Sequence, residues 1–442
     1  MDKKKDKKMD RNRVAAYLAL LDVETKHAYS NIALNNHIGR IHPESPAFVR
    51  ELTYGVLENK IYLDYVLQQF ISTPIKGLKA SDLVVLRMGI YQLRFMDSVP
   101  EYAAVNESVN LAKRYCRGRE GFVNGVLRSF IREGKRVELP DKEKDQMDYL
   151  SIKYSYAPWI VGLWLNEYPF DFVEDLLMAG NKTTDLVIRV NTLKISRNRL
   201  KEKILGKGYA VKEGIYCDKA LHVKGSNLLV ERFYQEGQFS VQDESSMIAV
   251  STLDPQPGEF IIDVCAAPGG KTFAMAEMMD NKGEILAWDI YKRKLAILQK
   301  ESERLGVDIV RVKTWDATRV DSSLIEKADR VLVDAPCSGL GVVRRKPEIK
   351  YKRLTSELKN LPKKQLAILS AAAKYVKPGG TLLYSTCTIN PHENTEVVKE
   401  FLYKNPHFSE EESIQLFPNI NNTDGFFICK MKKADDFIKT KI

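Results

Sequence analysis

The sequence has no C-x-x-C pair, and its six cysteines lie far apart along 442 residues. Closely spaced cysteines are typical of structural zinc sites and of dithiol redox sites, so we expect neither. The sequence also lacks an apolar run long enough to cross a membrane, and its first eight residues are mostly charged with no apolar stretch directly after them. These absences argue against a membrane span and a signal peptide, and they predict a cytoplasmic protein without metal.

The composition is typical of a globular protein, with 44% hydrophobic and 29% charged residues. A chain of this length exceeds one ordinary core, so we expect two or three domains. The net charge of +10 arises from 68 basic and 58 acidic residues. This surplus favours a polyanionic partner, most commonly nucleic acid, bound through local basic patches; solubility alone is the alternative explanation.

The hydrophobic pattern changes along the chain and suggests where domains begin and end. Apolar residues recur at helix spacing up to about residue 130, and a polar linker follows. Farther on, short apolar runs alternate with helical stretches, which is typical of a parallel sheet covered on both faces. We therefore predict a basic tail at 1–13, an all-helical domain at 14–135, a small α/β subdomain at 147–235 and a doubly wound, Rossmann-like α/β domain at 236–435.

A glycine-containing loop follows the first predicted strand of the last domain. After the apolar residues 260–262 comes the sequence DVCAAPGGKT at 263–272. Its small residues allow close approach of the backbone to a ligand, and the helix that begins near Thr272 offers free N–H groups. The spacing is not that of a P-loop. Tight packing between strand and helix is the alternative explanation for this loop.

An aspartate follows each of the next two strands. Asp289 is placed to accept hydrogen bonds from ribose hydroxyls, and Asp316 to border an adenine ring. Each aspartate alone is more simply interpreted as a turn or helix cap. Polar or small residues at three successive strand ends favour a cofactor that contains a nucleoside.

Two cysteines follow the last two parallel strands, in the sequences DAPCSGLG at 334–341 and STCT at 385–388. A lone cysteine is usually buried and inert, but two at neighbouring strand ends favour chemistry. A thiolate that adds to carbon 6 of cytosine makes carbon 5 nucleophilic enough to accept a methyl group. Asp334 is placed to exchange a proton with the ring.

These motifs resemble those of the bacterial-type RNA (cytosine-5)-methyltransferases of the Sun/Nop2 family, over residues 147–431. The resemblance implies a class I fold, the cofactor S-adenosyl-L-methionine, Cys387 as nucleophile and Cys337 in product release. DNA cytosine methyltransferases use the Pro-Cys thiol as nucleophile instead, so this assignment depends on the family. The resemblance implies that the cofactor is bound by Cys265, Ala266, Ala267, Pro268, Gly269, Gly270, Lys271, Asp289, Asp316 and Asp334.

The amino-terminal helices resemble the NusB-like RNA-binding domain in the sequences RELTYGVL at 50–57, VPEYAAVNE at 99–107 and FVNGVLR at 122–128. This domain, together with the small RRM-like subdomain and the catalytic domain, implies a monomer that methylates a cytosine in 16S rRNA. A tRNA cytosine-5 methyltransferase and a non-catalytic ribosome assembly factor are the alternatives. The basic segment 344–353 is interpreted as a phosphate-contacting rim with Tyr351 available to stack, or else as a solvated helix face.

Overall fold

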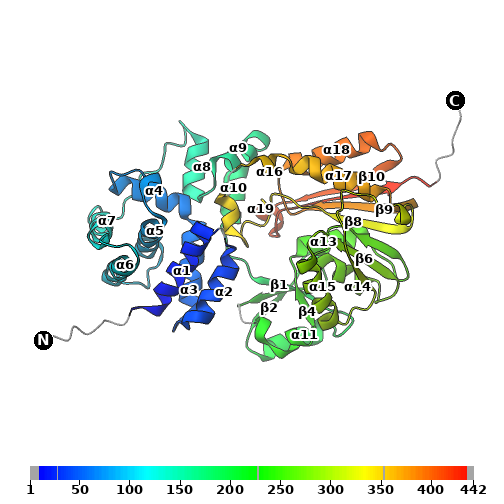
Figure 1. Ribbon diagram of the computed structural model, residues 1–442, viewed down its shortest axis with the longest axis horizontal. Helices are drawn as coiled ribbons and strands as arrows, with labels where there is room; N and C mark the ends of the chain where they lie inside the picture. The colour runs from blue at the N-terminus through cyan, green and yellow to red at the C-terminus, as the bar shows by residue number, and fades with distance from the viewer. Residues whose placement is uncertain (1–8, 27, 226–227, 352–353, 436–442) are drawn as a thin grey trace. The chain divides into compact units, whose positions relative to one another are not determined.

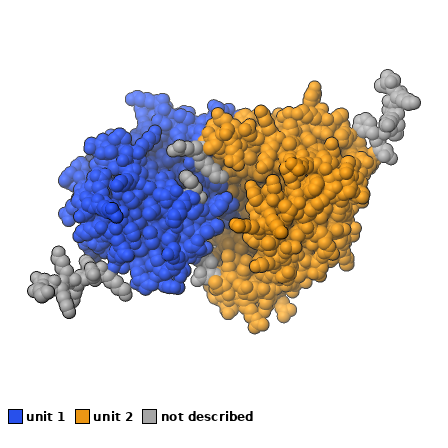
Figure 2. All heavy atoms as spheres, in the orientation of Figure 1, with its two compact units in different colours: residues 1–181, 345–353 blue, residues 182–344, 354–442 orange. Residues whose placement is uncertain are grey.

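The structure is a computed structural model that describes residues 9–26, 28–225, 228–351 and 354–435. The chain divides into two compact units, one containing residues 1–181 and 345–353 and the other the remainder (Figure 2). Within the described residues, no helix combines the length and the apolar character that a membrane span requires.

The first unit is helical and contains one large apolar core. In its seventh helix, the buried residues Val123, Val126, Leu127 and Phe130 recur at intervals of three and four and form one face. Its elements are α1 (Arg11–Lys26), α2 (Ser30–Ile41), α3 (Pro46–Glu58), α4 (Lys60–Phe70), η1 (Ile75–Gly77), α5 (Ala80–Phe95), α6 (Glu101–Tyr115), α7 (Glu120–Arg132), α8 (Gln146–Tyr154), α9 (Pro158–Glu167), α10 (Phe170–Gly180) and the short η4 (Pro347–Tyr351).

The predicted basic tail is too long at its carboxyl end. Helix α1 already begins at Arg11, and the buried side chain of Arg13 donates a hydrogen bond of 2.7 Å to the Gln92 side chain. Charge composition alone suggested a tail here, but a buried partner makes this part of the segment helical. Residues 1–8 of the predicted tail lie outside the described residues.

The second unit begins with a small antiparallel sheet in the order β2-β3-β1-β4. Ile188 and Val190 of one strand and Leu221 and Val223 of another pack into a separate small core. The small α/β subdomain expected in this region therefore contains a sheet of its own. The elements are β1 (Leu186–Val190), α11 (Arg197–Gly206), β2 (Ala210–Glu213), β3 (Ala220–Lys224), η2 (Leu228–Val230), α12 (Arg232–Gln235) and β4 (Phe239–Val241).

The larger sheet of the second unit has seven strands in the order β10-β11-β9-β8-β5-β6-β7. The five strands from β5 to β9 are parallel, as predicted, and β10 and β11 are antiparallel. The elements are α13 (Glu244–Leu253), β5 (Phe260–Asp263), α14 (Gly270–Met278), β6 (Glu284–Asp289), α15 (Lys292–Leu305), β7 (Val310–Thr314), η3 (Ser322–Leu324), β8 (Ala328–Asp334), α16 (Ser356–Lys359), α17 (Leu361–Ala373), β9 (Val376–Thr386), η5 (Pro391–Glu393), α18 (Thr395–Lys404), β10 (Phe408–Leu416), α19 (Pro418–Asn421) and β11 (Phe426–Lys433).

Each face of this sheet carries its own core. Ile262 and Val331 pack with α17 and α18, whereas their neighbours Ile261 and Leu332 pack with α13, α14 and α15 (Figure 1). Successive residues of a strand point to opposite faces, so continuous apolar runs are required for burial on both sides. The predicted doubly wound architecture is therefore confirmed.

The small and the large sheet belong to one unit, and the contacts place the division between units after Asn181. Helices α8 to α10 accordingly pack with the helical unit, although the sequence groups them with the small α/β subdomain. The boundary predicted near residue 147 depends on a polar linker, and such composition does not reveal which core the following helices cover.

Candidate active site

The order of the large sheet reverses between β5 and β8. From this point the chain proceeds through β6 and β7 on one side and through β9 on the other. Loops that leave adjacent strands in opposite directions open a crevice at their carboxyl ends, which is where such sheets bind ligands. Asp263 ends β5 and Asp334 ends β8, so both carboxylates lie at this crevice.

The two predicted catalytic cysteines are in contact. Cys337 Sγ lies 3.2 Å from Cys387 Sγ. Strands β8 and β9 are paired with Asp334 opposite Ser385, and the backbone N–H of Gly341 donates to the Cys387 carbonyl, so both loops are fixed. The hydrogen bond to Cys387 and burial raise the pKa of the Cys337 thiol well above its usual value. Cys337 therefore carries its proton at neutral pH.

Asp334 lies beside these sulfurs and has two partners. Its Oδ2 accepts from Lys271 Nζ at 2.8 Å, and its Oδ1 accepts from Ser385 Oγ at 2.9 Å. The Lys271 ammonium also lies 4.8 Å from the centre of the Phe426 ring. These contacts fix the carboxylate and join the predicted cofactor loop to the predicted chemical site.

The loop between β5 and α14 requires glycine at its last position. Gly269 has φ +113°, and a Cβ there would lie 2.5 Å from Phe273 Cε2. This backbone directs the first N–H groups of α14 toward the crevice end of the sheet, where an intrahelical partner is not available to them.

Asp263 is a buried carboxyl at the base of this loop. Its Oδ2 accepts from Thr272 Oγ1 at 2.7 Å, while Oδ1 has no hydrogen-bond partner among the described residues. Burial raises the pKa of Asp263 to about 7. Asp263 belongs to the sequence motif at 263–272 but is not among the predicted site residues. Its position at the end of β5 is the feature of the sequence that could have identified it.

Asp263 should make the stability of the free protein depend on pH. A carboxyl with a raised pKa stabilises the fold fully below its ordinary value of 3.8 and loses this contribution as pH rises through about 7. The difference between pKa values of 3.8 and about 7 corresponds to about 4 kcal/mol in the free energy of unfolding. Thermal unfolding should therefore show a smaller loss of stability from pH 5 to pH 8 in Asp263→Asn than in the unmodified protein. Equal losses in the two proteins would contradict this origin.

The ends of β6 and β7 meet beside the loop. The Ala266 N–H donates to the Trp288 carbonyl, and the Trp315 N–H donates to the Asp289 carbonyl. Asp289 Oδ1 accepts from the Tyr291 N–H at 2.8 Å, whereas Asp316 Oδ1 accepts from the Thr318 N–H and hydroxyl. Both aspartates thus cap turns. The second oxygen of Asp289 is used by none of these bonds, whereas Asp316 Oδ2 lies 3.9 Å from Arg319 Nε.

Burial and two neighbouring carboxylates keep the Cys265 thiol protonated. Burial raises the pKa of this thiol, and the negative charges of Asp263 and Asp334 raise it further. It therefore stays protonated, and we assign it no nucleophilic role. Cys116 and Cys429 are buried, and burial raises both of their pKa values, which suits a structural role.

Arg189 of β1 bonds to the end of the predicted cofactor loop. Sequence reasoning did not identify Arg189 as part of the site. Its guanidinium forms a buried bidentate ion pair with Glu277 of α14 at 2.8 and 2.9 Å. It also donates to the Gly270 carbonyl at 2.8 Å and to the Gln242 side chain. Arginine suits this planar two-point contact. An arginine within an otherwise apolar strand was the only signal in the sequence.

Arg344 and Lys350 of the basic segment 344–353 have buried side chains, so neither is available for the predicted phosphate-contacting rim. Arg344 is buried against Asp424 at 2.9 Å within the second unit. In the first unit, Lys350 is 1% exposed and donates to the Glu58 carbonyl and to Asn181 Oδ1, and burial lowers its pKa to about 7. The Tyr351 hydroxyl accepts from the Lys60 N–H at 3.1 Å. Both the rim and the solvated-face interpretations are wrong for Lys350, because its charged end is inside. Lys352 and Arg353 lie outside the described residues.

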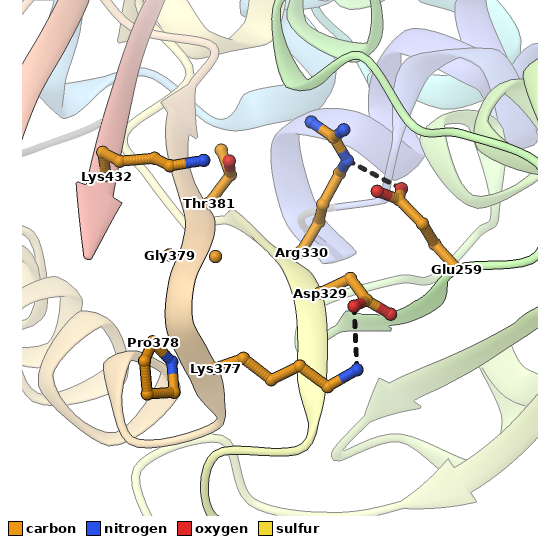
Figure 3. Close-up of a pocket in the computed structure, with 9 residues that line it drawn as sticks. Glu259, Asp329, Arg330, Lys377, Pro378, Gly379, Thr381 and Lys432 are labelled. Carbon is orange, nitrogen blue, oxygen red and sulfur yellow. Dashed lines mark hydrogen bonds and ion pairs between the residues drawn. The ribbon is translucent and has the colours of Figure 1, made fainter. Parts of the chain in front are cut away.

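A polar pocket lies at the opposite edge of the large sheet, where β5 and β8 begin (Figure 3). Its charged residues largely pair with one another, Arg330 with Glu259 and Lys377 with Asp329. It is lined by Glu259, Asp329, Arg330, Lys377, Pro378, Gly379, Gly380, Thr381 and Lys432. None of the predicted site residues lines it. In the described part of the chain, no group of three His, Cys, Asp or Glu side chains is arranged to bind a metal ion.

The crevice offers the chemical groups that S-adenosylmethionine requires. Asp263 Oδ1 is a buried acceptor without a partner among the described residues, which suits the cationic amino group of the cofactor. The N–H groups at the start of α14 suit its carboxylate, and the second oxygen of Asp289 suits its ribose. The sheet order and this crevice are those expected of an S-adenosylmethionine-dependent methyltransferase.

Comparison with known proteins gives the family. Residues 250–432 match the family described as "16S rRNA methyltransferase RsmB/F", residues 10–132 match the "NusB family", and residues 156–228 match the RsmF/B-like "ferredoxin-like domain". The chain is 38% identical to the "Probable ribosomal RNA small subunit methyltransferase B" of Bacillus subtilis (strain 168), over 95% of this chain and 98% of the relative. The chain belongs to this family of rRNA small subunit methyltransferases.

Two solved structures are similar to this chain. The crystal structure of PH0851 is similar with a TM-score of 0.84 and 26% identity, over 96% of this chain and 99% of that chain. The structure of NSun6 from Pyrococcus horikoshii with SFG is similar with a TM-score of 0.58 and 25% identity, over 62% and 98% of the two chains. The predicted fold and the predicted cofactor class are thereby confirmed.

Proposed function

We propose that the protein methylates carbon 5 of a cytosine in 16S rRNA, with Cys387 as the nucleophile. The contact of 3.2 Å between Cys337 and Cys387, beside Asp334 at the crevice, is the observation that carries this proposal. One thiol that keeps its proton next to a second thiol suits a division of labour between nucleophile and helper. Curated relatives named as rRNA small subunit methyltransferases support the choice of substrate.

The proposed chemistry assigns one role to each sulfur. Cys387 loses its proton, and its thiolate adds to carbon 6 of cytosine, so that the ring electrons move to carbon 5, which becomes nucleophilic. S-adenosylmethionine, when bound, supplies a methyl group on a positively charged sulfur. Asp334, which accepts hydrogen bonds from Lys271 and Ser385, shares a proton with the ring nitrogen of the base as negative charge builds on the ring. Once Cys387 is bonded to carbon 6, the largest cause of the raised pKa of Cys337 is gone, and Cys337 loses its proton to solvent. As a thiolate it then takes the carbon-5 proton, the electrons of that C–H bond restore the double bond between carbons 5 and 6, and Cys387 leaves as a thiolate.

The remaining site assignments are part of the same proposal. The loop 265–271 would hold the methionine portion of the cofactor, Asp289 its ribose and Asp316 the adenine side. The NusB-like region at 14–135 would contact RNA. Because carbon 6 must reach Cys387, the target cytosine must be unpaired or flipped out of its helix.

Transfer of a labelled methyl group to defined RNAs tests the proposal. Purified protein is incubated with labelled S-adenosylmethionine and either 16S rRNA or tRNA transcripts, and the digested nucleosides are identified by mass spectrometry. We expect 5-methylcytidine from the 16S transcript only. Label in tRNA alone would show that tRNA is the substrate instead. A methyl group at another atom would show that the protein does not methylate carbon 5 of cytosine. No label in any transcript would support the non-catalytic alternative.

Cellular rRNA provides an independent check. In a strain that lacks the gene, one 5-methylcytidine should disappear from 16S rRNA, and expression of the unmodified protein should restore it. If every 5-methylcytidine of 16S rRNA persists in that strain, the protein has another target.

A further inference from the structure

Glu393 is a buried carboxylate beside the two cysteine loops. Its side chain has no exposed surface. Four hydrogen bonds reach its two oxygens, all from uncharged groups. A buried carboxylate is costly unless its lone pairs are satisfied, and here four donors fill the acceptor sites. The carboxylate is therefore fixed in place.

The donors come from both sides of Cys337. Ser338, the next residue, donates its N–H to Oε2 at 2.8 Å and its hydroxyl to Oε1 at 2.5 Å. Gln365 donates to Oε2 at 3.0 Å and also to the carbonyl of Pro336, the residue before Cys337. Glu393 thus binds the Pro-Cys loop on both sides of the cysteine. It bonds directly to Ser338 after Cys337, and through Gln365 to Pro336 before it.

The same carboxylate is joined to the Thr-Cys loop. Ser338 Oγ lies 2.8 Å from Thr388 Oγ1, and Thr388 directly follows Cys387. Asn390 donates to Glu393 Oε1 at 2.9 Å. Cys387, however, is held independently, since it directly follows β9 and its carbonyl accepts from Gly341. Loss of the Glu393 contacts should therefore displace Cys337 more than Cys387.

We propose that Glu393 is a positioning residue that holds Cys337 against Cys387 for release of the methylated base. This inference rests on the proposed function, in which Cys337 assists that step.

Glu393→Gln tests the role, because it keeps the size of the side chain but replaces an acceptor oxygen by an N–H donor. Two of the four donors then face another donor. Hydrogen bonds to charged groups are worth enough to change rates about tenfold to a hundredfold. We expect product release to slow by about that factor, with a covalent protein–RNA adduct accumulating on a denaturing gel, while methyl transfer in a single turnover remains close to that of the unmodified protein.

Glu396→Gln is the matched control, since Glu396 lies three residues away, is exposed and pairs with His392. It should show no adduct. If Glu393→Gln does not fold, Ser338→Ala removes only the bridging hydroxyl and should give the same adduct at a lower level. A merely structural role would reduce adduct formation and methyl transfer together.

The inference is overturned if Cys337→Ala traps an adduct but neither Glu393→Gln nor Ser338→Ala does. If Cys337→Ala traps none and the unmodified protein forms no 5-methylcytidine, the proposed function itself has failed, and the role of Glu393 fails with it. The two failures are therefore distinguishable in one set of gels.

Discussion

Replacing Cys387 by alanine should abolish methylation of 16S rRNA. Without its sulfur, no bond to carbon 6 can form, and carbon 5 stays too weak a nucleophile to accept the methyl group. We expect the rate to fall by more than about a thousandfold, equivalent to more than about 4 kcal/mol of lost transition-state stabilisation. Incorporation of labelled methyl into the 16S transcript under single-turnover conditions measures this loss.

Cys217→Ala is the control for this experiment, because Cys217 is a half-buried cysteine of the small α/β subdomain outside the crevice. It should retain activity close to that of the unmodified protein. Binding of S-adenosylmethionine to Cys387→Ala should also be retained, since no cofactor-binding role is assigned to this side chain. Substantial methylation by Cys387→Ala would transfer the nucleophilic role to Cys337.

Replacing Cys337 by alanine should have a different effect, namely accumulation of a covalent protein–RNA adduct. Cys387 still attacks carbon 6 and the methyl group is still transferred, but the carbon-5 proton leaves slowly without the neighbouring thiol at 3.2 Å. Most of the protein should then migrate as a shifted band on a denaturing gel with 16S transcript, and multiple-turnover methylation should fall by about a hundredfold or more.

The double variant Cys337→Ala with Cys387→Ala shows which sulfur forms the adduct. It should give no shifted band, because the nucleophile is absent. A Cys337→Ala protein that turns over normally and shows no shifted band would remove Cys337 from product release. The adduct should also require a cytosine at the target, so a transcript with uridine at that position is a second control.

The location of the two cysteines at one end of the sheet could be predicted from sequence, because parallel strands place their carboxyl ends together; their separate roles rest on the resemblance to the family. Once Val331–Val333 and Leu382–Leu383 were identified as strands, Cys337 and Cys387 had to lie at that edge. The order of the strands was not available from the sequence, however. Two residues at the same end of a sheet can still be several strands apart. The two sulfurs are in contact because β8 pairs directly with β9.

The basic segment 344–353 shows where sequence reasoning fails. Local composition predicted solvent exposure, but burial is a property of the contacts that a segment finds far along the chain. Lys350 bonds to Glu58 and Asn181, which are more than 160 residues earlier. The predicted tail wrongly included Arg13 for the same reason, since its partner Gln92 lies on another helix.

Glu393 and Arg189 were equally inaccessible to pattern reading. A glutamate at the start of a helix is usually a solvated residue that stabilises the helix dipole, and no spacing marks it as the centre of four hydrogen bonds. Arg189 and Glu277 are 88 residues apart, so their pairing follows only from the packing of β1 near α14.

The sequence by itself determined the alternation of strands and helices, the glycine-containing loop and the edge at which the chemical groups gather, because these follow from periodicity and from residue order along single elements. Only the tertiary structure decided which of those groups touch. Contact between Cys337 and Cys387, and burial of Glu393, Arg189 and Lys350, depend on side chains brought together from distant parts of the chain, and local preferences carry no information about such pairs.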